Sequence, residues 1–372
     1  MVIVKSIFPP VEIAKEPFGD TVMAALWAGA VNNPKKNALI SAEDNSVGVT
    51  YSDLYLSSLS VAAFLEERHF GHGDIACLVL PNCWQWVPIF TGCSIQGGAI
   101  SGASVVFTDY ELERQFLDSK SKIVFCSDTA LERVLKAVRK CPGILNIVVV
   151  ETLGSPISPD QFPFGVHRFS DVLKTPPGRG FPKKDIDVNR DIMLLPYSSG
   201  TTGSPKGVMI SHKNFGTMLN IISDHVDNHI FKDFNINMAN EHLILMLPFY
   251  HIYGFGNLMQ VLTRGGTGVI MNHFDPDVFF RSIEKFKVRL LFLVPPILVV
   301  LAKHPAISKY NLSSLEFIIS GAAPAGKDIC DEVQKKHPNL KYIVQGYGMT
   351  EISMASHLPD LKNPKIGSAG KT

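Results

Sequence analysis

The sequence lacks an excess of charge of either sign. Its 372 residues include 35 Lys and Arg and 34 Asp and Glu, which gives a formal net charge of +1. Proteins that bind the phosphate backbone of nucleic acids normally carry a basic excess, so the charge balance argues against a nucleic-acid partner. Internal repeats and low-complexity tracts are also absent. With 46% hydrophobic and 19% charged residues, the composition is that of a globular protein long enough for two domains.

Cysteine pairs with the spacing of metal or redox sites are missing as well. None of the cysteines forms a C-x-x-C motif, and most of them stand in apolar, strand-like runs. We therefore expect buried, reduced thiols in a protein of a reducing compartment. The six cysteines are Cys77, Cys83, Cys93, Cys126, Cys141 and Cys330.

No hydrophobic run is long enough to cross a bilayer, which takes about 20 apolar residues. The two most apolar stretches are residues 242–262, interrupted by Pro248 and His251, and residues 290–301, interrupted by Pro295. We expect both to be buried parallel strands followed by their loops. The N-terminal segment is too short for a secretory signal peptide and lacks its small-residue cleavage site, so we expect a cytoplasmic protein without a transmembrane segment.

The most informative segment that the sequence contains is Tyr197-Ser-Ser-Gly-Thr-Thr-Gly-Ser-Pro-Lys-Gly207. Glycines let backbone N–H groups turn toward a ligand, the serine and threonine hydroxyls add donors, and Lys206 supplies a positive charge. These are the groups that bind a polyphosphate, so the segment predicts a nucleoside triphosphate as ligand. A mobile Ser/Gly linker would not be expected between two apolar strands with a lysine near the turn.

This segment is not a P-loop. The P-loop motif G-x-x-x-x-G-K-[ST] runs straight into a helix whose N-terminus holds the phosphates. Counted from Gly200, Pro205 stands at the second glycine position, and Gly207 stands where the motif requires Ser or Thr. Residues 208–210 predict a short strand, and helical spacing of apolar residues begins only near Phe215. We therefore expect a hairpin-like loop between two strands.

Short apolar runs alternate with helical patterns along the chain, which predicts an α/β fold with mostly parallel sheets. A polar stretch rich in Pro and Gly, residues 154–184, is the clearest linker candidate. The predicted division is a first α/β lobe with its linker, residues 1–184, and a second α/β lobe, residues 185–372. The expected strands of the first lobe are residues 75–80, 99–107, 122–126 and 144–150, and its expected helices are residues 84–96, 110–117 and 131–138.

Three further clusters of glycine and polar residues each follow an expected strand in the second half of the chain. They are Pro248–Gly254, Ser320–Pro324 and Gln345–Glu351. In open α/β sheets, ligands bind beyond the carboxyl ends of the strands. Together with residues 197–207, four loops are therefore expected to meet at one crevice.

Two histidines, His225 and His229, stand four residues apart in a helical pattern and would share one face of the helix. This spacing is compatible with a pair of metal ligands. A solvated helix face is the interpretation that we favour.

Three of these segments resemble the core motifs of the adenylate-forming superfamily: residues 198–207 (SSGTTGSPKG), 320–324 (SGAAP) and 345–351 (QGYGMTE). The chain looks most like 4-coumarate–CoA ligases, beetle luciferases and related acyl-CoA synthetases, and residues 80–82 (LPN) also fall where that family has similar residues. The resemblance covers most of the chain. It implies the large N-terminal domain of the adenylate-forming fold, with two α/β lobes and mostly parallel sheets.

The resemblance also implies an activity. An enzyme of this kind is an ATP-dependent acid–thiol ligase, which activates an aromatic or fatty acid as an acyl-adenylate and transfers it to coenzyme A. Its place would be in lipid or fatty acid metabolism. The implied partners are a small carboxylic acid, ATP and coenzyme A, with Mg²⁺ bound to the phosphates.

Roles for individual residues around ATP follow from the same resemblance. Residues 198–202 and Lys206 would hold the β- and γ-phosphates, and Thr350 would reach the α-phosphate. Glu351 would hold Mg²⁺ together with Thr202. The residues implied to contact the nucleotide are Ser198, Ser199, Gly200, Thr201, Thr202, Lys206, Ala322, Ala323, Gln345, Gly346, Tyr347 and Thr350, among which Tyr347 would stack on adenine and the two alanines would edge the base.

On the acid side, the resemblance places His251 on a loop that lines the acyl pocket and gates the path of the thiol. A histidine in such an apolar stretch is otherwise a hydrogen-bonded core residue, and we favour the functional role. The implied catalytic residues are then Lys206, His251, Thr350 and Glu351. The residues implied to shape the acyl pocket are His251, Tyr253, Gly321, Met354 and Ala355.

The chain ends at Thr372, where the resemblance implies a ribose-binding aspartate, a hinge and a small C-terminal lid domain still to come. We therefore expect the lid to be absent. Two alternatives to a working ligase stay open: a non-catalytic remnant that binds nucleotide or acid, and a luciferase-like relative that shares the adenylation step. A peroxisomal address would belong to a full-length relative.

Overall fold

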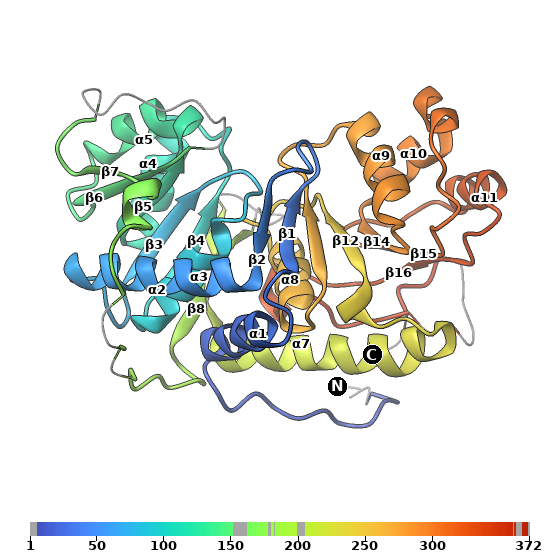
Figure 1. Cartoon of the computed structure of the whole chain (residues 1–372), viewed down its shortest axis with the longest axis horizontal. Helices are drawn as coiled ribbons and strands as arrows, with labels where there is room; N and C mark the ends of the chain where they lie inside the picture. Colours follow the sequence, from blue (N-terminus) through green and yellow to red (C-terminus); the bar gives the residue numbers. More distant parts are fainter. Residues whose placement is uncertain are drawn as a thin grey trace.

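Figure 1 shows the computed structural model of the protein, which describes residues 6–151, 162–177, 180–181, 183–198, 205–359, 361 and 367–370. The described residues form sheets of seven, four, three and two strands, and most of the strand pairs are parallel. The expected α/β fold with mostly parallel sheets is thus confirmed. None of the described helices is long and apolar enough to cross a membrane.

Strands and helices alternate through most of the chain. The strands are β1 Asn37–Ser41, β2 Gly48–Thr50, β3 Ile75–Val79, β4 Ala99–Ala103, β5 Ser121–Ser127, β6 Asn146–Val150, β7 Val166–Arg168, β8 Ile192–Leu194, β9 Tyr197–Ser198, β10 Lys206–Gly207, β11 Ile210–Ser211, β12 His242–Leu245, β13 Thr267–Ile270, β14 Leu290–Leu293, β15 Phe317–Ser320 and β16 Tyr342–Gln345. The helices are α1 Phe18–Asn32, α2 Tyr51–Glu67, α3 Trp86–Ile95, α4 Asp109–Ser119, α5 Leu131–Val138, α6 Phe169–Val172, α7 His212–Val226 with a π-helical continuation at Asp227–Phe231, α8 Ile252–Thr263, α9 Pro276–Phe286, α10 Pro295–Lys303 and α11 Lys327–Lys336.

The seven-stranded sheet has the order β11-β8-β4-β3-β5-β6-β7. Its central strand β3 is apolar throughout, because both of its faces are covered by helices. Leu78 belongs to the hydrophobic cluster that includes Trp86 of α3, whereas Val79 belongs to the cluster that includes Phe116 of α4. Successive residues of the strand therefore bury their side chains against opposite layers of helices.

The other two large sheets have the orders β12-β13-β1-β2 and β14-β15-β16. The N-terminal strand β1 pairs with β13, so that Leu39 lies opposite Gly268. On the other side, β8 and β11 extend the seven-stranded sheet beside β4. The predicted lobe boundary between residues 184 and 185 stays a prediction. Strands from both sides of this boundary pair within the same sheets.

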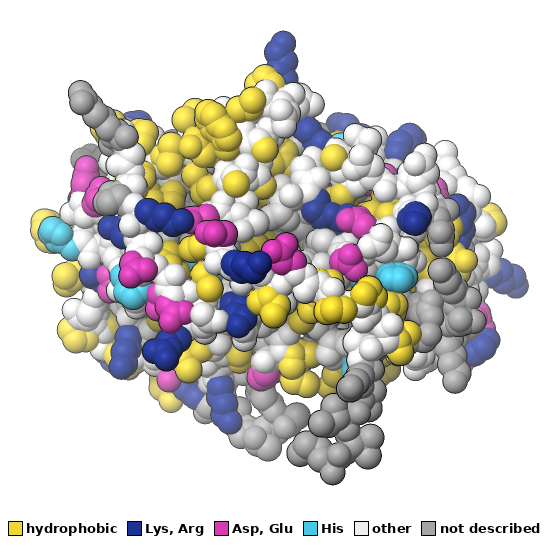
Figure 2. All heavy atoms as spheres, turned by 90° about the horizontal axis from the view of Figure 1, so that it is seen from below, with side chains coloured by type: hydrophobic (Ala, Val, Ile, Leu, Met, Phe, Trp, Pro, Cys, Tyr) yellow, Lys and Arg dark blue, Asp and Glu magenta, His cyan; other side chains and the backbone are white. Residues whose placement is uncertain are grey.

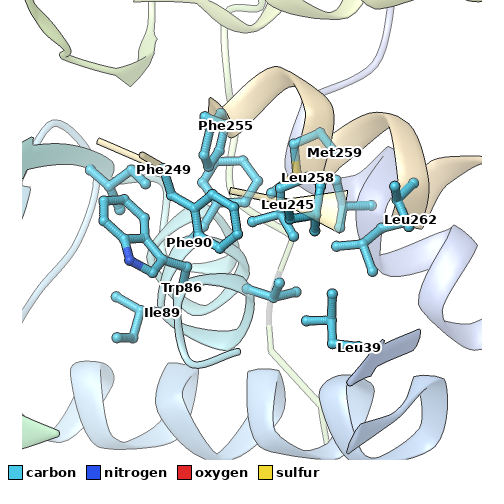
Figure 3. Packing of buried hydrophobic residues seen from close by; sticks show 14 of the residues in the cluster. Leu39, Trp86, Ile89, Phe90, Leu245, Phe249, Phe255, Leu258, Met259 and Leu262 are labelled. Atoms are coloured by element: carbon cyan, nitrogen blue, oxygen red, sulfur yellow. The ribbon is translucent and has the colours of Figure 1, made fainter. Parts of the chain in front are cut away.

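Helix α8 lies between the seven-stranded and four-stranded sheets and is buried on nearly all sides. Figure 3 shows its Phe255 beside Phe90 of α3, with ring centroids 5.2 Å apart. The same figure shows Leu258, Met259 and Leu262 in the direction of Leu39 on β1. One continuous hydrophobic cluster therefore joins the two sheets.

Two expectations about apolar stretches are corrected by the structure. Residues 252–263 and 295–303 are not loops after strands but the helices α8 and α10. A helix that is buried all round shows no amphipathic period, so its sequence looks like that of a buried strand.

The linker expected over residues 154–184 is also only partly correct. Residues 166–168 form β7, which pairs with β6, and the following helix α6 buries Phe169 and Val172. Residues 152–161 lie outside the described part of the chain.

The cysteines are free and buried, as the sequence predicted. Burial raises the pKa of the Cys77 thiol, and of the Cys83 thiol, to about 12. At neutral pH these thiols stay protonated and are poor nucleophiles.

Figure 2 shows Lys and Arg side chains interspersed with Asp and Glu side chains across one face of the molecule. This distribution agrees with the formal net charge of +1.

His212, the first residue of α7, is a structural histidine. Its side chain is 1% exposed, and its Nδ1 accepts a hydrogen bond of 3.1 Å from the backbone N–H of Phe18 at the start of α1. Burial lowers the pKa of His212 to about 4. Protonation of Nδ1 would also break the hydrogen bond to Phe18, so the folded state requires the neutral imidazole.

His212 therefore predicts a loss of stability in acid. Between pH 6.5 and about 4, the unfolded state binds a proton that the native state does not, so stability that is present above pH 6.5 is lost as the pH falls. The full effect is about 3 kcal/mol in the free energy of unfolding. Urea unfolding at pH 7, 6, 5 and 4.5 should show a smaller pH dependence for His212→Asn, whose Oδ1 can still accept from Phe18, than for the wild type. Equal dependences would contradict this assignment.

Candidate active site

A cavity of about 460 Å³ lies where the loops after several parallel strands meet. Its walls come from the end of β9, the loop between β12 and α8, and the loops after β15 and β16, so the expected convergence of four segments is observed. One side of the cavity is formed by α7 and its π-helical continuation. The site residues expected from the sequence that line it are Ser198, His251, Tyr253, Gly321, Ala322, Gly346, Tyr347, Thr350, Glu351, Met354 and Ala355.

The segment that the sequence predicts to bind phosphates begins as the expected hairpin. β9 and β10 are antiparallel, with Ser198 opposite Lys206 and Tyr197 opposite Gly207. The chain continues into β11 before α7 starts at His212, so no helix N-terminus follows the lysine directly. Ser199, Gly200, Thr201 and Thr202 lie outside the described residues.

A hydrogen bond joins the hairpin to the loop after β16. Ser198 Oγ donates to Glu351 Oε1 over 2.8 Å, although the two residues are 153 positions apart. Glu351 stands on a short 3₁₀ turn, Thr350–Ile352, and Thr350 lines the cavity beside it. The structure therefore brings together a carboxylate, two hydroxyls and the start of the segment predicted to bind phosphates on one part of the cavity wall, which we call its mouth.

The loop after β16 is tightly folded back on itself. Tyr347 and His357 form an isolated antiparallel bridge, and the ring of Tyr347 remains 48% exposed. A Cβ at position 348 would overlap the carbonyl oxygen of Met354, so only glycine fits there. Met354 itself has a φ of 128°, a conformation that costs a residue with a side chain energy. The conformation that places Thr350 and Glu351 on the cavity wall therefore includes a strained backbone at Met354.

The loop after β15 approaches the aromatic side chain of Tyr253. A Cβ on Gly321 would stand 3.0 Å from the Tyr253 ring. Tyr253 Oη donates a hydrogen bond of 3.3 Å to the carbonyl oxygen of Ile319, and burial raises the pKa of Tyr253. Ala322 has a left-handed φ of 68°. This part of the wall is uncharged and shaped by small residues.

His251 stands at the N-cap of α8 and faces the cavity. The residue is exposed to solvent, yet partial burial of the imidazole by the surrounding protein lowers its pKa. It is therefore neutral near pH 7. The turn before it packs against Gly254 of α8, where a Cβ would overlap the carbonyl oxygens of Leu247 and Pro248.

The loop that carries His251 is held from the other sheet by Asn82. Asn82 Nδ2 donates to the carbonyl oxygens of Leu245 (3.2 Å) and Leu247 (3.0 Å), and its Oδ1 accepts from the Phe249 N–H over 2.9 Å. Sequence reasoning noted residues 80–82 but assigned Asn82 no role. A polar residue directly after the apolar strand β3, at the end where ligands bind, was the available signal.

Among the expected site residues that the structure describes, three do not line the cavity. Lys206 is exposed on β10, and Ala323 is exposed beyond Ala322. The side-chain amide of Gln345 is engaged with the backbone of Ala325, whose N–H donates to Gln345 Oε1 over 2.9 Å. Their implied roles toward the nucleotide stay predictions.

The metal-site interpretation of His225 and His229 finds no support in the described residues, where no group of three His, Cys, Asp or Glu side chains could hold a metal. The favoured alternative, a solvated helix face, is wrong for His225. This side chain is 4% exposed and lines the cavity, and its Nε2 lies 2.7 Å from the carbonyl oxygen of Pro359.

An α/β fold whose polar loops surround a cavity beyond the carboxyl ends of parallel strands defines a class of proteins that bind small molecules there. Within that class, the chain belongs to the AMP-binding enzyme family, whose model matches residues 26–372. The resemblance to the adenylate-forming superfamily is thereby confirmed.

Known proteins agree with this assignment. The chain is 32% identical over 329 residues to 4-coumarate–CoA ligase 1 of Arabidopsis thaliana, a match of 86% of this chain and 56% of the relative. It is also 32% identical over 358 residues to acyl-CoA synthetase 7 of Caenorhabditis elegans, covering 96% of this chain and 64% of the relative. The chain thus spans less than two thirds of the length of these curated relatives.

Solved structures confirm the fold. The crystal structure of a long-chain-fatty-acid–CoA ligase from Archaeoglobus fulgidus superposes with a TM-score of 0.81 at 22% identity, covering 98% of this chain and 70% of that chain. The fold is that of the large N-terminal domain of adenylate-forming enzymes.

The close packing at Gly348 predicts that a side chain at this position weakens the binding of ATP. In Gly348→Ala, the added methyl group would displace the Met354 carbonyl and with it the turn that carries Thr350 and Glu351. We expect affinity for ATP to fall by about tenfold to a hundredfold. Titration with a fluorescent ATP analogue measures this. Gly71→Ala is the matched control, because a Cβ there meets nothing within 4 Å. Equal affinities in the two variants would refute the proposed sensitivity.

Removal of the Asn82 carboxamide predicts a loss of stability. Asn82→Ala breaks three hydrogen bonds and leaves the buried Phe249 N–H without its acceptor. The free energy of unfolding should fall by about 2–4 kcal/mol, as measured by urea denaturation. Asn339→Ala, which removes one exposed hydrogen bond to the Ser313 carbonyl, should cost less than about 1 kcal/mol. If the two variants lose equal stability, Asn82 does not have the structural role that its contacts indicate.

Proposed function

We propose that this chain is the adenylating part of an ATP-dependent acid–CoA ligase. The observation that carries the proposal is the hydrogen bond between Ser198 and Glu351 at the mouth of the cavity. It joins the phosphate-binding segment to the acidic turn, and the acyl-lining residues lie behind them. The names of the curated relatives, a 4-coumarate–CoA ligase and an acyl-CoA synthetase, support the same class of reaction.

The proposed reaction has two steps. A carboxylate oxygen of the acid attacks the α-phosphorus of ATP, the bond from that phosphorus to the β-phosphate oxygen breaks, and pyrophosphate leaves. The thiol sulfur of coenzyme A then attacks the acyl carbon, and AMP leaves. Both steps depend on positioning and on stabilisation of charge on phosphate oxygens.

On the nucleotide side, we assign Thr350 to the α-phosphate and Lys206 with Ser198 to the β- and γ-phosphates. The half-exposed ring of Tyr347 offers a face on which adenine can stack. Lys206 is exposed on β10, so it can reach phosphates outside the cavity mouth.

A magnesium ion fits the donor set at the mouth. Glu351 contributes carboxylate oxygens and Ser198 a hydroxyl, and Mg²⁺ is typically held by one or two carboxylates together with substrate phosphates. The bound cation would neutralise charge on the phosphates. The Ser198 hydrogen bond orients the Glu351 carboxylate toward that position.

On the acid side, the walls are apolar. Tyr253 and Gly321 form one flank, and Met354 with Ala355 forms another. A neutral His251 at the entrance can accept the proton of an incoming thiol, which would leave an imidazolium beside the thiolate. These features accommodate an aromatic or a fatty acid.

The six free thiols favour a reducing compartment such as the cytosol.

The test is pyrophosphate release by the purified chain with ATP, Mg²⁺ and a panel of aromatic and fatty acids. Glu351→Gln keeps an oxygen that can accept from Ser198 but removes the charge, and it should lower acid-dependent release about a hundredfold or more. Glu332→Gln is the matched control and should leave release unchanged, because this carboxylate on α11 lies 4.0 Å from Lys303 of α10 and does not line the cavity.

The outcomes separate the alternatives. Release that requires a particular acid and is lost only in Glu351→Gln supports the ligase. ATP binding without release with any acid would instead establish a nucleotide-binding protein that does not complete adenylation. Absence of ATP binding would overturn both.

A further inference from the structure

The side of the cavity formed by α7 carries residues to which the proposed reaction assigns no role, and we call this side the deep end. Ile222, Val226 and Ile230 line this end, spaced four residues apart along α7 and its π-helical continuation. The opposite wall is formed by Leu358 and Pro359. Nothing in the sequence singled out this end as part of a site.

His225 is the polar exception in this apolar wall. It lies on the same side of α7 as Ile222 and Val226, and its side chain is 4% exposed. Its Nε2 is 2.7 Å from the carbonyl oxygen of Pro359, so the imidazole links α7 to the facing wall across the end of the cavity. The imidazole of His225 therefore occupies the deep end of the cavity, and its contact with Pro359 sets the distance between the two walls there.

The outer side of His225 is blocked by the N-terminal segment. The Phe8 ring meets the His225 ring edge-on at a centroid distance of 4.9 Å. This segment is fixed along α7 by two hydrogen bonds, from the Ala14 N–H to Thr217 Oγ1 (3.0 Å) and from Asn220 Nδ2 to the Glu12 carbonyl (2.9 Å). Figure 1 shows the segment running below α7. The imidazole cannot swing outward to lengthen the cavity without displacing Phe8.

We propose that His225 closes the deep end of the acyl pocket and sets the longest acid that this protein accepts. The inference rests on the proposed function, because it takes the carboxyl group of the acid to lie near Thr350 and its tail to point toward α7. The substrate class is then a carboxylic acid whose apolar tail ends against Ile222, Val226 and the imidazole. Longer acids are excluded because their last carbons would overlap the ring.

The role is one of size, and variants can separate size from the hydrogen bond. His225→Ala removes the five ring atoms and opens space for about two to four further carbons. His225→Leu keeps most of the volume but cannot bond to Pro359. His229→Ala is the matched control, because His229 also packs against Phe8, at 4.8 Å, but does not line the cavity.

The experiment measures equilibrium binding of saturated fatty acids from 4 to about 18 carbons by displacement of a fluorescent fatty acid, so it does not depend on turnover. In the wild type and in His229→Ala, affinity should rise by roughly fourfold per methylene and then fall beyond a limiting length. In His225→Ala the limit should move to longer acids, with affinity for an acid three carbons beyond the wild-type limit raised about tenfold or more. His225→Leu should keep the wild-type limit and lower the melting temperature.

A second variant keeps the inference testable if His225→Ala does not fold. Val226→Phe adds volume to the same end and should shorten the limit. An unchanged limit in both Val226→Phe and His225→Ala would overturn the inference, as would an equal shift in His229→Ala. If fatty acids bind with a limit that these variants do not move, the proposed function survives and the role of His225 does not. If no fatty acid binds while ATP does, both the acid class and the inference fail.

Discussion

The contact between Asn82 and the loop after β12 is the constraint on which the site depends. The carboxamide follows β3 in one sheet and forms hydrogen bonds with both sides of a turn that follows a strand of another sheet. Because donor and acceptor atoms are fixed in one plane, the two sheets cannot slide past each other without leaving buried polar groups unpaired. At Gly102 on β4 the same turn approaches so closely that a Cβ would stand 2.7 Å from Tyr250. The position of His251 therefore depends on how the two sheets pack against each other.

Both polar and apolar side chains line the cavity. Glu351 and Ser198 bond to each other at the mouth, where charged phosphates can remain partly hydrated. Burial raises the pKa of Tyr253 and keeps it protonated, and partial burial of the imidazole lowers the pKa of His251 and keeps it neutral. An activated acid would thus meet charge only where phosphate leaves. Water that could hydrolyse the intermediate finds few polar partners elsewhere on the walls.

The fold class and the convergence of loops could be predicted because alternating apolar runs and glycine-rich clusters are local signals. Segments such as Gln345–Glu351 show both the end of a strand and the demand for close packing at Gly348. Helix α8 could not be recognised, because a helix buried on all sides has no polar face to reveal its period. His225 was misjudged for a related reason: its burial comes from Phe8 and Pro359, and neither contact leaves a mark in the sequence around the histidine. The role of Asn82 could not be predicted either, because its partners lie more than 160 positions away in the sequence.

The pairing of β1 with β13 has a consequence for how the protein is made. At a synthesis rate of about 5–20 residues per second, the roughly 230 residues between Leu39 and Gly268 separate the emergence of these partners from the ribosome by about 10–50 s. During that time β1 and its neighbour β2 can form a two-stranded hairpin that packs against α2, and the edge of β1 that faces β13 stays unpaired. The nascent chain therefore presents an aggregation-prone strand to the cell until β13 is complete. Chaperone binding near residues 37–50 would protect the growing polypeptide through this interval.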